Sequence, residues 1–354
     1  MGFSLGIVGL PNVGKSTLFN ALSGRLVNVS NYPFCTIDPN VAVVEVPDER
    51  LEKIRQILQS PKAIPTTIEF IDIAGLVKGA HKGEGLGNQF LSHIRTVDAI
   101  VQVVRCFVDD NIVHVDGSIN PQRDMEVINL ELVLADLAAV EKYLEKTKNA
   151  AKAGDKKQLQ QVADLETIRQ TLGKGVPLRL AGEDVLETAR GVPDLSLLTV
   201  KPMIYVANVA EAASLAQFEE KSDAIAIFAK TEAETKELPP AEQIEYLRAM
   251  GIAEGGVSRL IRAGYGLLNL ITFFTANEKE CRAWTCAAGT LVPQAAGKIH
   301  SDMEKGFIAA EIAHYADLIA CTSLAACREK GKLHVEGKNY IVQDGDLVQI
   351  RFNV

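Results

Sequence analysis

Short apolar runs alternate with helix-like stretches over the first third of the chain, and again after residue 200. Parallel strands that are covered on both faces are apolar throughout. The alternation therefore predicts an α/β fold with a mainly parallel sheet and helices on both faces. The runs that we expect to form its strands are Ser4–Val8, Val41–Val46, Thr67–Ile73, Ala99–Val104, Pro202–Ala207 and Ala224–Phe228.

A helical pattern separates the two parts of this sheet. Apolar residues recur at helical spacing from Asp124 to Lys148 and again from about Lys156 to Leu172, which predicts an α-helical hairpin. The strand pattern resumes afterwards, so we interpret the hairpin as an insertion. The domains are then residues 1–118 with 199–276 for the α/β part, and residues 119–198 for the inserted helices.

Residues 277–354 are predicted to form a small α+β module. A helix is expected over Ile299–Glu311. Two strand-like runs, Lys338–Val342 and Leu347–Arg351, flank an Asp-Gly pair, which favours a β-hairpin. Domains of this size suit a chain of 354 residues.

The composition narrows the class of protein. Hydrophobic residues make up 47% and charged residues 23%, as in globular proteins, and no apolar run approaches the roughly 18 residues of a membrane span. The net charge of −8 means that any nucleic-acid contact must use a local basic patch. The tip of the helical hairpin offers one suited to RNA phosphates, although a merely solvated tip is the alternative. Its lysines are Lys142, Lys146, Lys148, Lys152, Lys156 and Lys157.

Gly9–Ser16 match the phosphate-binding sequence G-x-x-x-x-G-K-S, placed between a strand and a helix as the motif requires. The backbone N–H groups of such a loop and the N-terminus of the helix bind phosphates. Lys15 is expected to reach the β- and γ-phosphates, and Ser16 to ligate Mg²⁺. The nucleotide contacts predicted from this loop are Asn12, Val13, Gly14, Lys15, Ser16 and Thr17.

Two further segments are expected to complete a magnesium and phosphate site. Asp72 ends an apolar strand and begins the D-x-A-G sequence found in GTPases. We expect Asp72 to hold Mg²⁺ through water and the Gly75 N–H to meet the γ-phosphate. Thr36, between the two motifs, is our candidate for completing the Mg²⁺ shell when a triphosphate is bound. Its neighbour Cys35 is either a redox-sensitive or an inert thiol.

The segment that reads the base differs from that of GTPases. They carry N-K-x-D, in which the Asp accepts two hydrogen bonds from guanine, whereas this chain has Asn208-Val209-Ala210-Glu211. Losing charged hydrogen bonds worth roughly 1.5–3 kcal/mol each removes most of the preference for guanine. We therefore predict that Asn208, Val209 and Glu211 bind ATP.

The residue that orients the attacking water in Ras-type GTPases is a glutamine, and here it is Leu76. A leucine cannot orient water, so another side chain must serve. His114, which follows the strand Ala99–Val104, is our first candidate for a catalytic role beside Lys15, and His81 is the second.

Together these motifs resemble those of one family. G-L-P-N-V-G-K-S-T, N-Y-P-F-C-T-I, D-I-A-G-L-V-K-G-A-H-K-G-E-G-L-G-N and N-V-A-E are similar to the sequences of the YchF group, the Obg-like ATPases of the translation-factor class. The resemblance covers nearly the whole chain. It implies a P-loop G domain, an inserted coiled-coil domain and a C-terminal TGS domain of the β-grasp type. Arg282–Thr285, Gln294–His300 and Glu336–Lys338 resemble the TGS domain.

The resemblance also implies an activity. Members of the group hydrolyse ATP slowly with Mg²⁺, prefer it to GTP, associate with ribosomes and carry a hydrophobic residue at the position of Leu76. We accordingly expect a cytoplasmic monomer. One position departs from the group, because Phe228 stands where a serine is usual. The base contact of this motif is made mainly by the backbone, so we expect it to survive. The alternative is that the bulky Phe228 reshapes the rim of the nucleotide pocket.

Two other functions stay open at this point. The chain would be a GTPase if the altered base motif still selected guanine. It would instead be a nucleotide-gated module that binds RNA or ribosomes if hydrolysis were incidental, and Leu76 supports that interpretation.

Overall fold

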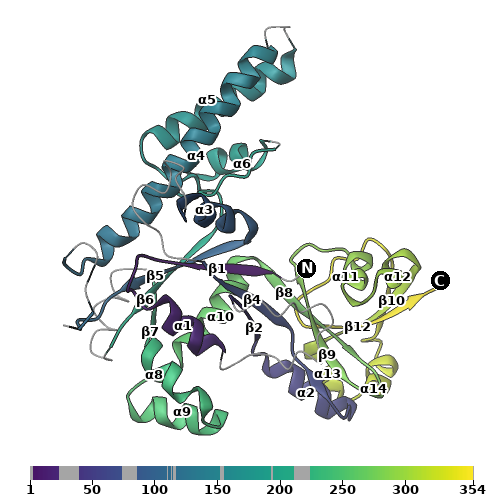
Figure 1. Ribbon diagram of the computed structural model, residues 1–354. Coiled ribbons are helices and arrows are strands. Elements are labelled where there is room, and N and C mark those ends of the chain that lie inside the picture. The colour runs from purple at the N-terminus through teal and green to yellow at the C-terminus, as the bar shows by residue number, and fades with distance from the viewer. Residues whose placement is uncertain are drawn as a thin grey trace.

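The computed structural model describes residues 3–23, 40–73, 86–109, 111–112, 114, 117–151, 155–192, 194–210 and 224–353. Two six-stranded sheets organise these residues, and a helical hairpin extends away from the first sheet (Figure 1). None of the helices described is both long and apolar enough to cross a membrane.

The first sheet has the strand order β2-β4-β1-β5-β6-β7. All neighbouring strands pair in parallel except β2, which runs antiparallel to β4. The predicted mainly parallel sheet is thereby confirmed. Its strands are β1 (Ser4–Val8), β2 (Val41–Glu45), β4 (Thr67–Asp72), β5 (Ala99–Arg105), β6 (Met203–Asn208) and β7 (Ile225–Ile227).

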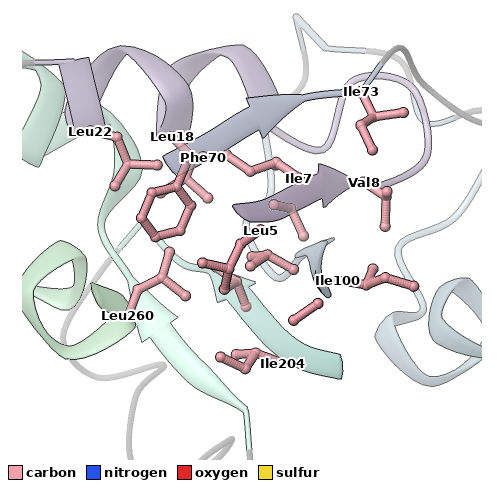
Figure 2. Close-up of a cluster of buried hydrophobic side chains, with 14 of the residues drawn as sticks. Leu5, Ile7, Val8, Leu18, Leu22, Phe70, Ile73, Ile100, Ile204 and Leu260 are labelled. Atoms are coloured by element: carbon pink, nitrogen blue, oxygen red, sulfur yellow. The ribbon is translucent and has the colours of Figure 1, made fainter. Parts of the chain in front are cut away.

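Helices cover both faces of the first sheet. Helix α3 lies on the opposite face from α1 and α10 (Figure 1). Every residue of β1 and β5 is buried, as expected for strands with no solvent face. Figure 2 shows Leu5 and Ile7 of β1 packed among Leu18 of α1 and Leu260 of α10. The bounds are α1 (Lys15–Ser23), α3 (Leu86–Thr96), α8 (Ala229–Glu234), η4 (Thr235–Glu237), α9 (Pro240–Ala249) and α10 (Gly256–Leu267).

The inserted helices have an apolar core of their own, which includes Val140 and Ile168. The two predicted helices form as α4 (Pro121–Ala151) and α5 (Lys156–Gly173). Asp136 of α4 ties the returning chain to the hairpin, because its carboxylate accepts hydrogen bonds from the N–H groups of Leu198, at 2.9 Å, and Thr199, at 2.7 Å. Smaller helices complete the insertion: η3 (Leu178–Leu180) and α6 (Glu183–Arg190).

The second sheet has the strand order β11-β10-β12-β8-β9-β3. It takes in β8 and β3, which the sequence analysis assigns to the α/β domain. Its strands are β3 (Ala63–Ile64), β8 (Leu270–Ala276), β9 (Cys281–Ala287), β10 (Phe307–His314), β11 (His334–Glu336) and β12 (Asp346–Phe352). Its helices are α11 (Val292–Ile299), α12 (Ser301–Lys305), α13 (Tyr315–Cys321) and α14 (Leu324–Glu329).

Helix α2 (Glu49–Leu58) packs with the elements of the second sheet. Its buried residues Leu51 and Ile54 share a core with Phe274 of β8 and Leu318 of α13. A segment that follows β2 of the first sheet therefore supplies part of the core of the second.

Two predictions for the C-terminal module are wrong. The helix expected over Ile299–Glu311 is interrupted, because α12 ends at Lys305 and is followed by Gly306, whose N–H donates to the Asp302 carbonyl at 2.8 Å, and β10 begins at Phe307. The expected hairpin is replaced by other pairings, since β12 pairs with β10 and β8, whereas Ile341 makes an isolated bridge to Leu291.

Candidate nucleotide-binding site

The phosphate loop between β1 and α1 has two residues with positive φ, Asn12 at 62° and Gly14 at 96°. A Cβ atom at Gly14 would lie 2.1 Å from the side-chain nitrogen of Asn208, so only glycine fits there. Asn208 ends β6, and its Nδ2 donates to the Val13 carbonyl at 3.0 Å. The structure thus brings together the phosphate loop and the first residue of the base-reading motif.

Lys15 and Asp72 form the charged part of the site. The Lys15 Nζ donates to the carbonyls of Gly9, at 3.1 Å, and Leu10, at 3.0 Å. Burial lowers the pKa of Lys15, and the charge of Asp72 opposes that shift. Burial raises the pKa of Asp72 in turn, against the effect of the Lys15 charge. Both ionised groups are therefore poorly solvated, and each would be stabilised by a ligand of opposite charge.

Asp72 also has an oxygen that suits a cation. Its Oδ1 is buried and has no hydrogen-bond partner among the residues described. A magnesium ion takes oxygen ligands, several of them water or phosphate, and needs only one or two carboxylates from the protein. The described residues contain no group of three His, Cys, Asp or Glu side chains that could enclose a metal by themselves. Asp72 and Ser16 therefore fit a cation that is held jointly with a nucleotide.

A cavity of about 620 Å³ opens beside the phosphate loop. This volume is in the range of small-molecule and cofactor sites. Four segments line it: Asn12, Gly14, Lys15, Ser16 and Thr17 of the loop and α1; Phe107, Val108, Asp109 and Ile112 after β5; Asn208, Val209 and Ala210 at the end of β6; and Lys230 and Thr231 of α8. Val13 contributes its carbonyl to Asn208, while its side chain is buried.

Sequence reasoning missed the wall after β5 and Thr231 of α8, whereas Lys230 lies in the run Ile227–Lys230 that corresponds to the last base-contacting motif. The wall carries no recognisable motif. Its only sequence signal is the placement of apolar side chains directly after a buried strand, at the edge where ligands bind in parallel sheets.

Known proteins resemble this chain over its whole length. It is 49% identical over 367 residues to the "Ribosome-binding ATPase YchF" of Bacillus subtilis, with 100% of both chains covered. The protein of the same name from Escherichia coli O157:H7 is 49% identical over 365 residues, again with 100% of both covered. The chain belongs to the YchF family.

Structural and domain comparisons agree with this membership. The solved structure of the Schizosaccharomyces pombe YchF GTPase matches with a TM-score of 0.87 and 39% identity, covering 99% of this chain and 98% of that one. Residues 4–163 match a domain family described as "50S ribosome-binding GTPase". Residues 270–353 match the C-terminal domain family of YchF GTPases, described as a protein of unknown function. The fold is thus that of a P-loop NTPase of the YchF family, and the chain is a nucleotide hydrolase by class.

The position at which this chain departs from the YchF group is not at the rim of the cavity. Phe228 is 4% exposed and packs with Val209, Leu247 and Ile252 in an apolar cluster under β6 and β7. The alternative that Phe228 reshapes the rim is therefore wrong. Phe228 directly precedes α8. Its side chain lies in the apolar core, whereas Lys230 and Thr231 in the first turn of α8 line the cavity.

His114 is not brought to the cavity in this structure. It is 7% exposed, and its Nε2 lies 2.9 Å from Oδ2 of Asp124, which is in the first turn of α4 and is itself 2% exposed. The residue therefore lies where the inserted hairpin begins.

Several predicted residues fall outside the described part of the chain: Cys35, Thr36, Gly75, Leu76, His81, Lys152 and Glu211. The remaining hairpin lysines, Lys142, Lys146, Lys148, Lys156 and Lys157, are exposed. One of them, Lys148, pairs with Glu166 at 2.6 Å. The cysteines described are not joined in disulfide bonds.

Proposed function

We propose that this protein is a Mg²⁺-dependent ATPase that prefers ATP to GTP and acts as a slow switch on the ribosome, in the cytoplasm and as a monomer. The proposal rests on the residues at the end of the cavity where the base would bind. Val209 stands where GTPases carry a lysine, and its side chain is 3% exposed, inside the apolar cluster under β6 and β7. The bacterial relatives are named ribosome-binding ATPases, whereas the fission-yeast protein is named a GTPase, so the base is the point to test.

The cavity wall supports recognition of a base by apolar contact. Val108 is 81% exposed and Ile112 is 36% exposed, although both are large hydrophobic residues. Such side chains pack against the faces of either purine and do not select guanine. Asn208 has its amide nitrogen engaged with the phosphate loop, which leaves its oxygen to accept a hydrogen bond. The exocyclic group of adenine donates a hydrogen bond there, whereas guanine presents an acceptor.

The phosphate end supports tight binding of a triphosphate. Lys15 exchanges its two backbone carbonyl partners for phosphate oxygens, which form stronger, charge-assisted hydrogen bonds. Asp72 and Ser16 hold the cation, with Thr36 and the Gly75 N–H as proposed further contacts. The magnesium ion, when bound, neutralises charge on the β- and γ-phosphates.

Hydrolysis and ribosome binding involve the inserted helices in this proposal. His114 would reach the attacking water only after its contact with Asp124 is broken. Because Asp124 is part of α4, a ribosome that displaces the hairpin would act on that contact. The exposed lysines at the hairpin tip would bind ribosomal RNA. We retain the three-domain division, with the C-terminal module beginning at β8, because β8 pairs within the second sheet.

The test is a paired titration of the purified protein with fluorescent, non-hydrolysable ATP and GTP analogues in the presence of Mg²⁺. We expect ATP to bind at least as tightly as GTP. Lys15→Ala, which removes the ammonium that would contact the phosphates, is expected to abolish tight binding of both. Wild-type binding of GTP more than about tenfold tighter, a difference of roughly 1.4 kcal/mol, would contradict the ATP preference.

A further inference from the structure

Arg105 is the last residue of β5 and is only 1% exposed. A buried guanidinium is costly unless hydrogen bonds replace its lost water. Here all three of its nitrogens donate to backbone carbonyls of the segment that follows: Nε to Phe107 at 3.1 Å, Nη2 to Asp109 at 3.1 Å and Nη1 to Ile112 at 2.9 Å. The guanidinium therefore fills the inside of this turn.

Among the residues described from Phe107 to Ile112, the hydrogen bonds made by the segment's own groups are short-range. The Ile112 N–H donates to the Asp109 carbonyl at 3.2 Å, and the Asn111 N–H donates to the Asp109 carboxylate at 2.9 Å. Both bonds close a local turn, and neither of them fixes the position of that turn relative to the sheet. The Arg105 side chain supplies the link between this turn and the end of β5.

Arg105 also contacts the ring of Phe107. Its Cζ lies 4.6 Å from the ring centroid, a distance at which a guanidinium is attracted to an aromatic face. Phe107, Val108, Asp109 and Ile112 all line the nucleotide cavity. One buried side chain thus determines the place of an entire wall of the cavity.

The same strand ends connect this wall to the phosphate loop. Arg105 is the register partner of Asn208 in the parallel pair of β5 and β6, and the Cys106 N–H donates to the Asn208 carbonyl at 2.9 Å. The side chain of Asn208 in turn holds the Val13 carbonyl. The distance between the wall and the phosphate loop is therefore set by bonded neighbours on β5 and β6.

We infer that Arg105 is a positioning residue for the base side of the nucleotide cavity, where it sets the affinity for the nucleoside and leaves the affinity for the phosphates unchanged. The inference rests on the proposed nucleotide site but not on which base is preferred. Lysine cannot substitute, because a single ammonium lacks the planar fork that reaches three carbonyls and stacks on a ring.

The experiment compares two ligands by isothermal titration calorimetry in the presence of Mg²⁺: a non-hydrolysable ATP analogue, and inorganic tripolyphosphate, which has no base or sugar. For Arg105→Lys and Arg105→Met we expect the Kd of the ATP analogue to rise about tenfold or more, since the wall that meets the base is no longer preorganised. The Kd of tripolyphosphate should stay within about twofold of wild type. Asp136→Asn is the control, because it disturbs a buried polar contact at the insertion and should leave the ratio of the two constants unchanged.

Two outcomes would overturn the inference. An equal loss for both ligands would overturn the inference, because it would make Arg105 a residue of general stability. Unchanged binding of the ATP analogue would overturn it as well. If Arg105→Met does not fold, the milder Arg105→Lys gives the same comparison. Should wild-type protein bind GTP more tightly, the ATP preference fails, but the inference is still tested by pairing a GTP analogue with tripolyphosphate.

Discussion

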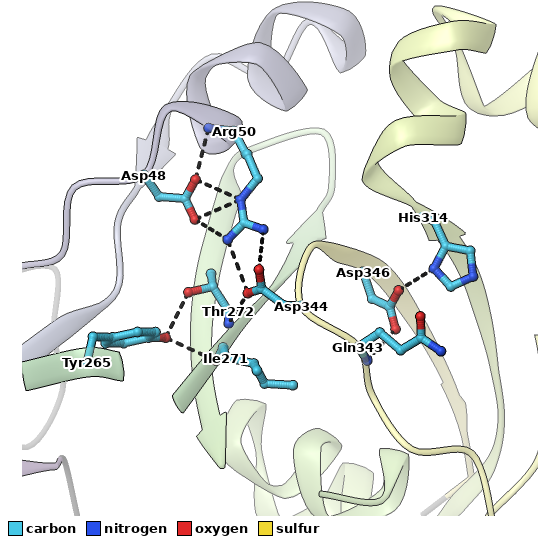
Figure 3. A network of polar contacts seen from close by, with 9 residues as sticks. All are labelled: Asp48, Arg50, Tyr265, Ile271, Thr272, His314, Gln343, Asp344 and Asp346. Carbon is cyan, nitrogen blue, oxygen red and sulfur yellow. Dashed lines mark hydrogen bonds and ion pairs between the residues drawn. The ribbon is translucent and has the colours of Figure 1, made fainter. Parts of the chain in front are cut away.

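Arg50 and Asp344 form a two-point ion pair although 294 positions separate them in the sequence. The Arg50 Nη1 lies 2.6 Å from one carboxylate oxygen of Asp344, and its Nη2 lies 3.2 Å from the other (Figure 3). Asp48 holds the remaining edge of the guanidinium, and the Thr272 N–H donates to Asp344 at 2.9 Å. Helix α2, the last loop of the chain and β8 are fastened together by this network.

The close approach of this loop depends on Gly345. Its φ is +93°, and a Cβ atom there would lie 3.2 Å from the Arg50 Nη1. A side chain at this position would be strained and would press against the guanidinium. The glycine of the Asp-Gly pair therefore allows the loop to contact Arg50 of α2, whereas the sequence pattern predicted that it forms a hairpin turn.

We expect the Arg50–Asp344 pair to contribute modestly to stability. A double-mutant cycle with Arg50→Ala and Asp344→Ala, measured by urea unfolding, should give a coupling of about 1 kcal/mol, because half of the Asp344 side chain is exposed and water screens the charges. The more exposed pair of Arg190 and Glu187 is the control and should show less coupling. A coupling of zero would mean that the other hydrogen bonds of the loop, among them those with Thr272, hold it without a contribution from the ion pair.

The same pair should make stability dependent on acid pH. Burial raises the pKa of Asp344, but the hydrogen bonds from Arg50 and Thr272 outweigh it, so the pKa is lowered. Because the folded pKa is lowered, the contribution is present above the unfolded value of about 3.9 and is lost as pH falls through the folded pKa. Melting temperatures from pH 6 to pH 3 should therefore fall less for Asp344→Asn than for wild type. Equal falls would exclude Asp344 as a source of the dependence.

Asp72→Asn should separate stability from function. Burial raises the pKa of Asp72, so stability decreases as pH rises through the range between the unfolded and folded pKa, and at neutral pH the carboxylate is a cost to the protein without ligands. We expect the variant to melt at an equal or higher temperature than wild type without ligands. It should also lose most of the additional stabilisation by Mg²⁺ and ATP. A full response of the variant to Mg²⁺ would place the cation elsewhere.

The hairpin lysines should contribute to ribosome binding through charge. Replacing Lys142, Lys146, Lys156 and Lys157 by Glu should weaken co-sedimentation with ribosomes and flatten its dependence on salt, since fewer lysines then displace counterions from RNA phosphates. The matched control replaces four exposed lysines of the C-terminal module, Lys305, Lys330, Lys332 and Lys338, by Glu. An unchanged salt slope for the hairpin variant would leave its tip as a solvated surface.

His114 and Asp124 can be distinguished by paired variants. Both His114→Ala and Asp124→Asn disturb a buried contact and should lower stability by about 1–3 kcal/mol. If His114 orients the water, only His114→Ala should lower ATP turnover, and more strongly with ribosomes than without. Single-turnover hydrolysis by both variants, with and without ribosomes, measures this. Equal turnover in the two variants would assign the pair to structure alone and direct attention to His81.

The sequence predicted best the features that depend on neighbouring residues. The strands of the first sheet are continuous apolar runs, and the phosphate loop is a contiguous motif, so both were located without knowledge of distant contacts. For Gly14, the sequence predicted the residue type but not the contact that requires it. The motif requires a glycine there, but only the structure shows that the side chain of Asn208 occupies the space next to it.

The features that sequence reasoning missed depend on partners far along the chain. The Asp344-Gly345 pair favours a local turn, yet Asp344 bonds to α2 and β8, and the neighbouring Asp346 bonds to His314 and Tyr340. Arg105 was missed for a related reason. A single arginine after an apolar strand resembles a surface charge, and its role appears only when three backbone carbonyls are seen around it.

The pairing of β3 within the second sheet and the packing of α2 against it have a consequence for synthesis. These segments emerge from the translating ribosome long before β8 and β9 exist, so the apolar face of α2 has no cover until the end of the chain is made. A chain terminated before Leu270 would retain every strand of the first sheet but would present Leu51 and Ile54 to water. Nascent chains stalled at that length are therefore expected to attract chaperones, and premature stop codons near the C-terminus to yield an aggregation-prone product.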